Sequence, residues 1–94
     1  MSISREDARL MVGRGWGLLI NRIYDRLPLS AYVSDVKEKY GSLRVYIDNV
    51  DQGIYDFLDG IERESCSVCE ECGERGKPRK GGWIKTLCDR CAVK

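Results

Sequence analysis

Two cysteine pairs near the C-terminus constrain this chain more than any other feature. The first pair is Cys69 and Cys72, the second is Cys88 and Cys91, and fifteen residues rich in glycine separate them. Four thiolates at this spacing are typical of a tetrahedral metal site, above all a structural Zn²⁺ site. A closed Cys₄ site leaves no coordination position for a substrate, so the pattern predicts a cofactor but no reaction.

A fifth cysteine, Cys66, leaves the choice of ligands open. Gly73, which follows Cys72, favours Cys69 and Cys72 as the first pair, because a residue without Cβ lets backbone N–H groups turn toward the thiolate. Pairing Cys66 with Cys69 is the alternative. An iron–sulfur cluster is a further reading, although the fourth cysteine does not follow at the short ferredoxin spacing. The predicted ligands are Cys69, Cys72, Cys88 and Cys91.

The length of the chain makes such a metal important for stability. A chain of 94 residues buries only roughly 60–65% of its unfolded surface. A structural Zn²⁺ site contributes on the order of 10 kcal/mol of apparent binding free energy, comparable to the net stability of a whole domain. We therefore expect a small α+β domain over residues 1–65 and a zinc ribbon over residues 66–94 that unfolds without metal.

The first part of the chain has helical periodicity. Ser4 with Asp7 three residues later is typical of a helix N-cap, and Pro28 ends the pattern. Glycines between positions 13 and 17 weaken the helix, which predicts two helices, 4–12 and 16–27, meeting at a bend. Trp16 is expected in the core. The apolar face consists of Val12, Trp16, Leu19, Ile20, Ile23 and Leu27.

The period changes to two at Tyr32, which predicts an antiparallel β-hairpin broken at residues 40–42. Leu43, Val45 and Ile47 give the second strand an apolar face. In the first strand, strict alternation puts Val33 and Val36 on opposite faces, and Val33, Val36 and Tyr40 also fit a helix.

Apolar residues at helical spacing then predict a second amphipathic helix over residues 51–65. They are Ile54, Phe57, Leu58 and Ile61. The predicted fold class is α+β: helix, β-hairpin, helix, then a C-terminal Cys₄ zinc ribbon.

Charge is distributed unevenly, although the formal net charge is only +1. Residues 51–71 carry seven acidic side chains and one basic one, whereas residues 72–94 carry seven basic and two acidic ones. Flexible cations beside an aromatic ring suit phosphate contact and base stacking. A solvated turn, with Trp83 covering the apolar side of the ribbon, is the alternative. The candidate ligand-binding residues are Arg75, Lys77, Arg79, Lys80, Trp83 and Lys85.

Several function classes are disfavoured. The chain has no histidine, so it lacks the usual base that activates a thiol and the commonest acid–base group near neutral pH; we therefore predict that it is not an enzyme. No run approaches the roughly 18 apolar residues of a membrane span, and the N-terminus lacks a signal-peptide pattern. A cytoplasmic location is expected, where cysteines bind metal rather than form disulfides.

Two segments carry a resemblance. One is VKEKYGSLRVY at residues 36–46; the other runs from Cys69 to Cys91, with CxxCG followed by GWIKTLCxxC. Together they resemble a group of small uncharacterised proteins encoded in bacterial genomes and in phages or prophages. The resemblance implies a small accessory protein that binds host enzymes, defence components or nucleic acid, and the likeness to zinc ribbons implies binding rather than catalysis.

The sequence thus leads to two functional hypotheses. In the first, a non-enzymatic zinc-binding protein binds nucleic acid or a phosphorylated ligand through its basic ribbon tip. In the second, a phage- or prophage-type protein binds and regulates or inhibits a host defence protein, using the hairpin and the acidic helix as its surface. No membrane partner is expected.

Overall fold

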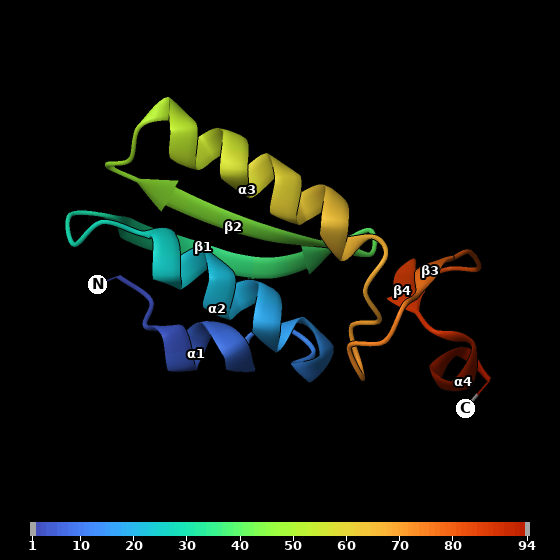
Figure 1. Ribbon diagram of the computed structural model, residues 1–94. Helices are drawn as coiled ribbons and strands as arrows, with labels where there is room; N and C mark the ends of the chain where they lie inside the picture. The colour runs from blue at the N-terminus through green and yellow to red at the C-terminus, as the bar shows by residue number, and fades with distance from the viewer. Residues whose placement is uncertain (1, 94) are drawn as a thin grey trace.

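The computed structural model describes residues 2–93 and confirms the α+β class (Figure 1). Helices α1 and α2 precede a β-hairpin, helix α3 follows it, and a small cysteine-bearing unit ends the chain. Among residues 2–93, no helix is long and apolar enough to cross a membrane. The elements are α1 (Arg5–Leu10), η1 (Arg14–Trp16), α2 (Gly17–Arg26), β1 (Tyr32–Lys39), β2 (Ser42–Asp48), α3 (Gln52–Ser65), β3 (Lys77–Arg79), β4 (Lys85–Leu87) and α4 (Asp89–Ala92).

The N-terminal segment bends where the glycines predict. Ser4 Oγ accepts the N–H of Asp7 at 3.1 Å and caps α1. The chain then leaves the helix at Met11, passes through the 3₁₀ turn η1, and re-enters a helix at Gly17. Trp16 is fully buried, as expected for a residue on the apolar stripe.

The hairpin is confirmed, and the helical alternative for its first strand is wrong. β1 pairs with β2 from Tyr32 opposite Asp48 to Lys39 opposite Ser42. The predicted alternation in β1 is also wrong, because the register shifts at a β-bulge between Val33 and Asp35. The extra residue brings both Val33 and Val36, each 1% exposed, onto the inner face of the sheet.

Two residues, Tyr40 and Gly41, form the turn of the hairpin. Both have positive φ, 54° at Tyr40 and 82° at Gly41. A two-residue hairpin turn of the primed type requires this conformation, and Asn or Gly is the usual choice for it. A bulky aromatic residue at the first position is therefore uncommon.

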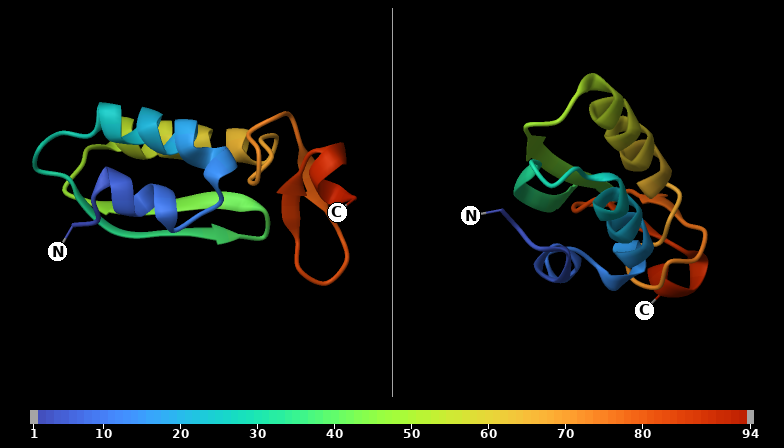
Figure 2. Two further views of the ribbon diagram at one scale, coloured as in Figure 1. Left: turned by 90° about the horizontal axis from the view of Figure 1, so that it is seen from below. Right: turned by 60° about the vertical axis from the view of Figure 1, so that its left-hand side comes forward.

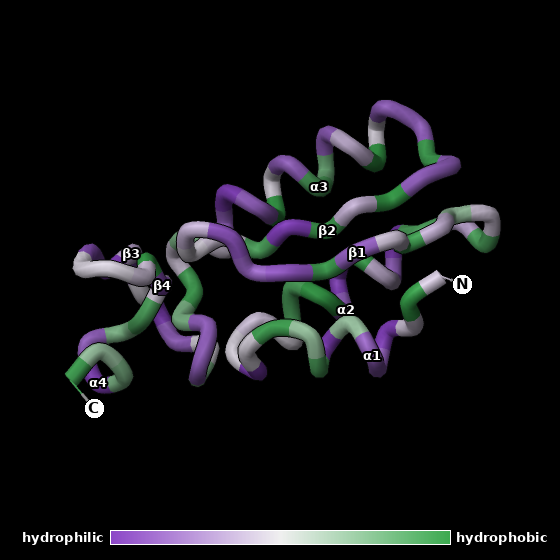
Figure 3. The backbone as a smooth tube through the Cα atoms, turned by 180° about the vertical axis from the view of Figure 1, so that it is seen from behind, coloured by the Kyte–Doolittle hydropathy of each residue, from purple (hydrophilic) through white to green (hydrophobic). Residues whose placement is uncertain are grey.

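Helices α2 and α3 cover the same face of the hairpin, as Figure 2 shows. Asp51 caps α3 by accepting the N–H of Ile54 at 3.1 Å, and the hydrophobic stretches of α3 face the hairpin (Figure 3). The core lies between these helices and the sheet, and α1 and η1 each contribute one residue to it. Its buried members are Ala8, Trp16, Leu19, Ile20, Ile23, Val33, Val36, Leu43, Ile47 and Ile61.

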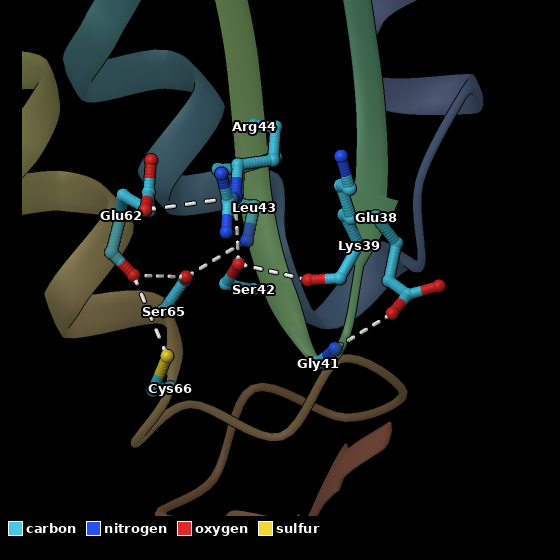
Figure 4. A network of polar contacts seen from close by, with 9 residues as sticks. All are labelled: Glu38, Lys39, Gly41, Ser42, Leu43, Arg44, Glu62, Ser65 and Cys66. Carbon is cyan, nitrogen blue, oxygen red and sulfur yellow. Dashed lines mark hydrogen bonds and ion pairs between the residues drawn. The ribbon is translucent and has the colours of Figure 1, made fainter. Parts of the chain in front are cut away.

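Side chains and backbone groups close parts of both outer edges of the hairpin. On β2, Ser65 Oγ accepts the N–H of Leu43 at 2.9 Å (Figure 4), and the Tyr55 hydroxyl donates to the carbonyl of Ile47 at 2.9 Å. On β1, the N–H of Ile3 donates to the carbonyl of Val33 at 2.9 Å. α3 and the N-terminal segment thus flank the two-stranded sheet.

The C-terminal unit, residues 66–93, is called the ribbon below. It begins with a knuckle in which Val68 and Arg75 form an antiparallel bridge. The short hairpin β3–β4 follows, with Lys77 opposite Leu87. The second cysteine pair lies at the start of the one-turn helix α4, and Cys88 is the N-cap of this helix.

Candidate metal centre

The structure brings the four predicted cysteines together. The Sγ atoms of Cys69, Cys72, Cys88 and Cys91 all lie within 4.8 Å of one another. The closest contact described, between Cys72 and Cys88, is 3.6 Å. In a tetrahedron with metal–sulfur bonds of about 2.3 Å, sulfur atoms lie about 3.8 Å apart. The cluster therefore has the size and the donor atoms to hold one thiophilic metal ion.

The first knuckle is held by its own backbone. The N–H of Cys69 donates to Glu74 O at 2.7 Å, and the N–H of Gly73 donates to Cys69 O at 2.9 Å. Gly73 has a φ of 87°, a left-handed conformation that suits glycine. Its predicted role at the turn of the knuckle matches this geometry.

Local donors control the ionisation of Cys69. Burial raises the pKa of this thiol, but N–H groups of Cys88, Cys72 and Glu71 outweigh burial and lower the pKa to about 6. A thiolate is the form that binds metal. The backbone therefore favours the ionised form of Cys69, in which it could bind a metal ion.

The second pair uses the start of a helix. The N–H of Cys91 lies 3.4 Å from Cys88 Sγ, and this contact is the first cause of the lowered pKa of Cys88. Cys91 shows the opposite effect, because its contact with the Cys88 thiol raises its pKa to about 12. Neighbouring thiolates repel one another, so all four ionise together only when a cation lies between them.

Cys66 lies outside the cluster. Its Sγ points back along α3 and contacts the carbonyl of Glu62 at 3.7 Å (Figure 4). The thiol is half-buried at the end of the helix. The structure therefore groups Cys69 with Cys72, and not with Cys66, beside the second pair.

The first knuckle is docked onto the turn between α1 and α2. The N–H of Gly15 donates to Glu70 O at 2.9 Å, and Trp16 Nε1 donates to Val68 O at 2.8 Å. A Cβ placed on Gly15 would lie 2.0 Å from Cys69 O, and one on Gly13 would lie 2.1 Å from Glu70 O. These glycines permit a close backbone approach, which explains their presence better than flexibility does.

Strand β4 is docked onto the turn of the main hairpin. The Thr86 hydroxyl donates to Gly41 O, and the N–H of Thr86 donates to Glu70 Oε2 at 3.0 Å. Thr86 and Glu70 are both buried, and burial is the main reason that the pKa of Glu70 is raised. Residues from the two resembling segments, Gly41 and Thr86, are thus in direct contact.

The predicted basic tip is only partly free. Arg79 is half-buried and its guanidinium donates to Leu87 O and, at 2.9 Å, to Asp89. Trp83 is 74% exposed and does not cover the apolar side of the ribbon; its Nε1 donates to Glu38 Oε1 at 3.2 Å. The remaining predicted ligand-binding residues are exposed: Arg75, Lys77, Lys80 and Lys85.

Sequence reasoning missed the joint between the ribbon and the hairpin. Nothing in the sequence around Thr86 or Glu38 indicates that these residues contact a distant segment. The one unusual feature at the docking position is the Tyr40-Gly41 turn. No protein-family model, no curated protein and no solved structure matches this chain, so its candidate metal centre is defined by its own four cysteines.

Proposed function

We propose that the cluster binds Zn²⁺ and that the protein is a small non-enzymatic zinc-binding protein. The observation that carries this proposal is the convergence of four Sγ atoms within 4.8 Å. Zinc takes four thiolates in a tetrahedral structural site, and such a site has no vacant position for water or substrate. The ion would join the first knuckle to the start of α4 and have no chemical step to perform.

The ligand set can be tested with metal content and Co²⁺ substitution. We expect one ion per chain in the wild type and in Cys66→Ser, because Cys66 lies outside the cluster. Cys72→Ser should lower metal affinity strongly and change the Co²⁺ spectrum, because one thiolate ligand is lost. A Cys66→Ser protein that loses its metal would contradict the assignment.

We further propose that the exposed basic side of the ribbon binds nucleic acid. Arg75, Lys77, Lys80 and Lys85 are exposed, whereas Asp89, a nearby carboxylate, is paired with Arg79. Phosphate contacts through flexible cations supply most non-specific nucleic-acid affinity. Arg79, already bonded within the ribbon, has a positioning role in this proposal rather than a phosphate contact.

Salt dependence provides the test. The logarithm of the binding constant for a single-stranded oligonucleotide should fall linearly with the logarithm of the salt concentration. The slope is about −0.7 for each phosphate that the protein neutralises. The double variant Lys80→Ala, Lys85→Ala should therefore bind more weakly and reduce the slope by about 1.4. Arg63→Ala, which removes an exposed cation from α3, is the control and should bind like the wild type. Absence of binding at low salt would contradict the proposal.

A protein partner is the second candidate, and one observation favours it. A hollow of about 420 Å³ lies between β2 and α3, with Leu43 and Ile61 among its apolar lining residues. Its polar lining includes Asp48, Asp59 and Glu62, so it suits a segment that presents apolar and basic side chains. A stoichiometric protein complex that survives nuclease treatment would favour this candidate over nucleic acid.

A further inference from the structure

A second hollow opens where the ribbon meets the turn of the main hairpin. It has a volume of about 240 Å³ and is lined by Glu38, Lys39, Tyr40, Gly82, Trp83 and Ile84. Two large aromatic side chains stand exposed at its walls, Tyr40 at 71% and Trp83 at 74%. One comes from the hairpin and the other from the ribbon, so the hollow depends on the docked ribbon.

We infer that this hollow, called the aromatic seam below, stacks a base of single-stranded nucleic acid. The inference rests on the proposed nucleic-acid function and adds where a base is held. Aromatic platforms next to cations are the general design of single-strand binding, because every base has a π face. The seam provides the rings, and Lys39, Lys80 and Lys85 provide exposed cations along the two segments that form it.

A hydrogen bond ties the indole of Trp83 to the main hairpin. Glu38 accepts Trp83 Nε1 through one carboxylate oxygen at 3.2 Å and the N–H of Gly41 through the other at 2.7 Å. One carboxylate thus ties the ring of the ribbon to the turn that carries Tyr40. A ring held before the ligand arrives loses less conformational freedom on binding.

Tyr40 occupies a backbone position that aromatic residues rarely adopt. Its φ is 54°, and the residue packs little against the rest of the molecule, since it is 71% exposed. Asn or Gly would fit this turn better, so the fold gains little from a tyrosine here. An uncommon conformation kept without a packing benefit points to a binding role.

The charges around the hollow bear on the choice between nucleic acid and a proline-rich peptide, which aromatic grooves also bind. The lining holds one carboxylate and one ammonium, Glu38 and Lys39, and both oxygens of Glu38 already accept N–H groups. Lys39 Nζ lies 6.0 Å from the centre of the Tyr40 ring. An ammonium near the ring on which a base would stack can neutralise a phosphate of the same strand, and an uncharged proline-rich peptide offers no such anion. The ligand class is therefore an oligonucleotide with unpaired bases.

The test compares two oligonucleotides of equal length and charge, one of thymidines and one abasic throughout. The wild type should bind the thymidine strand about five- to hundredfold more tightly, because only this strand can stack. Trp83→Ala should remove the difference, and Trp83→Phe, which keeps a ring, should retain most of it. Salt-dependent binding of the abasic strand should be little changed in both variants.

Tyr40→Asn separates stacking from stability. Asn suits the positive φ, so the urea midpoint of this variant should be equal to or higher than that of the wild type. Its preference for thymidine over abasic strand should nevertheless fall. If Tyr40→Asn keeps the full preference, the inference is wrong, whatever Trp83→Ala shows.

The outcomes distinguish this inference from the proposed function. Equal binding of both strands by the wild type overturns the aromatic seam as a stacking site but leaves phosphate binding by the ribbon intact. Failure of both strands to bind overturns both. A proline-rich peptide that displaces neither strand supports the assignment, whereas one that binds in the seam more tightly than the thymidine strand overturns it.

Discussion

Removing the metal should unfold the ribbon and leave the rest of the molecule folded. Among the described residues 66–93, the buried hydrophobic residues are Cys69 and Cys88, which are themselves candidate ligands. A unit of this size has too small a core to fold without a staple. Structural Zn²⁺ contributes about 10–16 kcal/mol in zinc-finger peptides, so its loss exceeds what the remaining contacts provide.

Hydrogen–deuterium exchange with and without a chelator measures this effect. Amides bonded within the ribbon, such as those of Glu70 and Gly76, should lose protection when the metal leaves. Amides of α2 at Ile20 and Ile23, which belong to the main core, should keep most of theirs. Adding Zn²⁺ back should restore the original pattern. Unchanged exchange in a protein shown to be free of metal would contradict the prediction.

Gly15→Ala should be the most damaging small substitution where the first knuckle docks onto the turn between α1 and α2. The new Cβ would lie 2.0 Å from Cys69 O and 2.6 Å from the backbone nitrogen of Gly73, both in the first knuckle. Backbone atoms cannot move aside as a flexible side chain can. The knuckle must separate from the turn and lose the hydrogen bond from Gly15 to Glu70, at a total cost of about 3 kcal/mol or more.

Gly60→Ala provides a matched control for this substitution. Gly60 lies inside α3, and a Cβ placed there meets nothing within 4 Å. Alanine in a helix is favoured over glycine by about 0.5–1 kcal/mol. The urea midpoints of the two metal-loaded variants should therefore move in opposite directions, down for Gly15→Ala and up for Gly60→Ala. A Gly15→Ala midpoint equal to that of the wild type would show that the knuckle is not docked as described.

Local signals were enough to predict most elements of the fold. Ser4 marked the start of α1, and the alternation of Leu43 and Ile47 marked β2. The bulge after Val33 was not predicted, because a bulge depends on the partner strand and on the helices that require both valines inside. The sequence of one strand alone does not specify its register with the partner strand.

The candidate metal site was predictable because its signal is local in the sequence. In a CxxC pair, two potential ligands lie within four residues of each other, so the pattern can be recognised without knowledge of the fold. The structure brings the two pairs together: Cys69 and Cys72 with Cys88 and Cys91. The joint between ribbon and hairpin was not predictable, since Gly41 and Thr86 are far apart in the chain and meet only in space. The internal hydrogen bonds of Arg79 were not predictable either, because Leu87 O comes within its reach only when β3 and β4 pair.

The closed edges of the main hairpin have a consequence for how the protein behaves in concentrated solution. A two-stranded sheet presents two free edges, each a template on which another chain can add a strand and begin to aggregate. Here Ser65 and Tyr55 use edge groups of β2, and Ile3 uses one of β1. These contacts reduce the number of backbone groups available to a neighbour and should suppress growth of intermolecular β-structure.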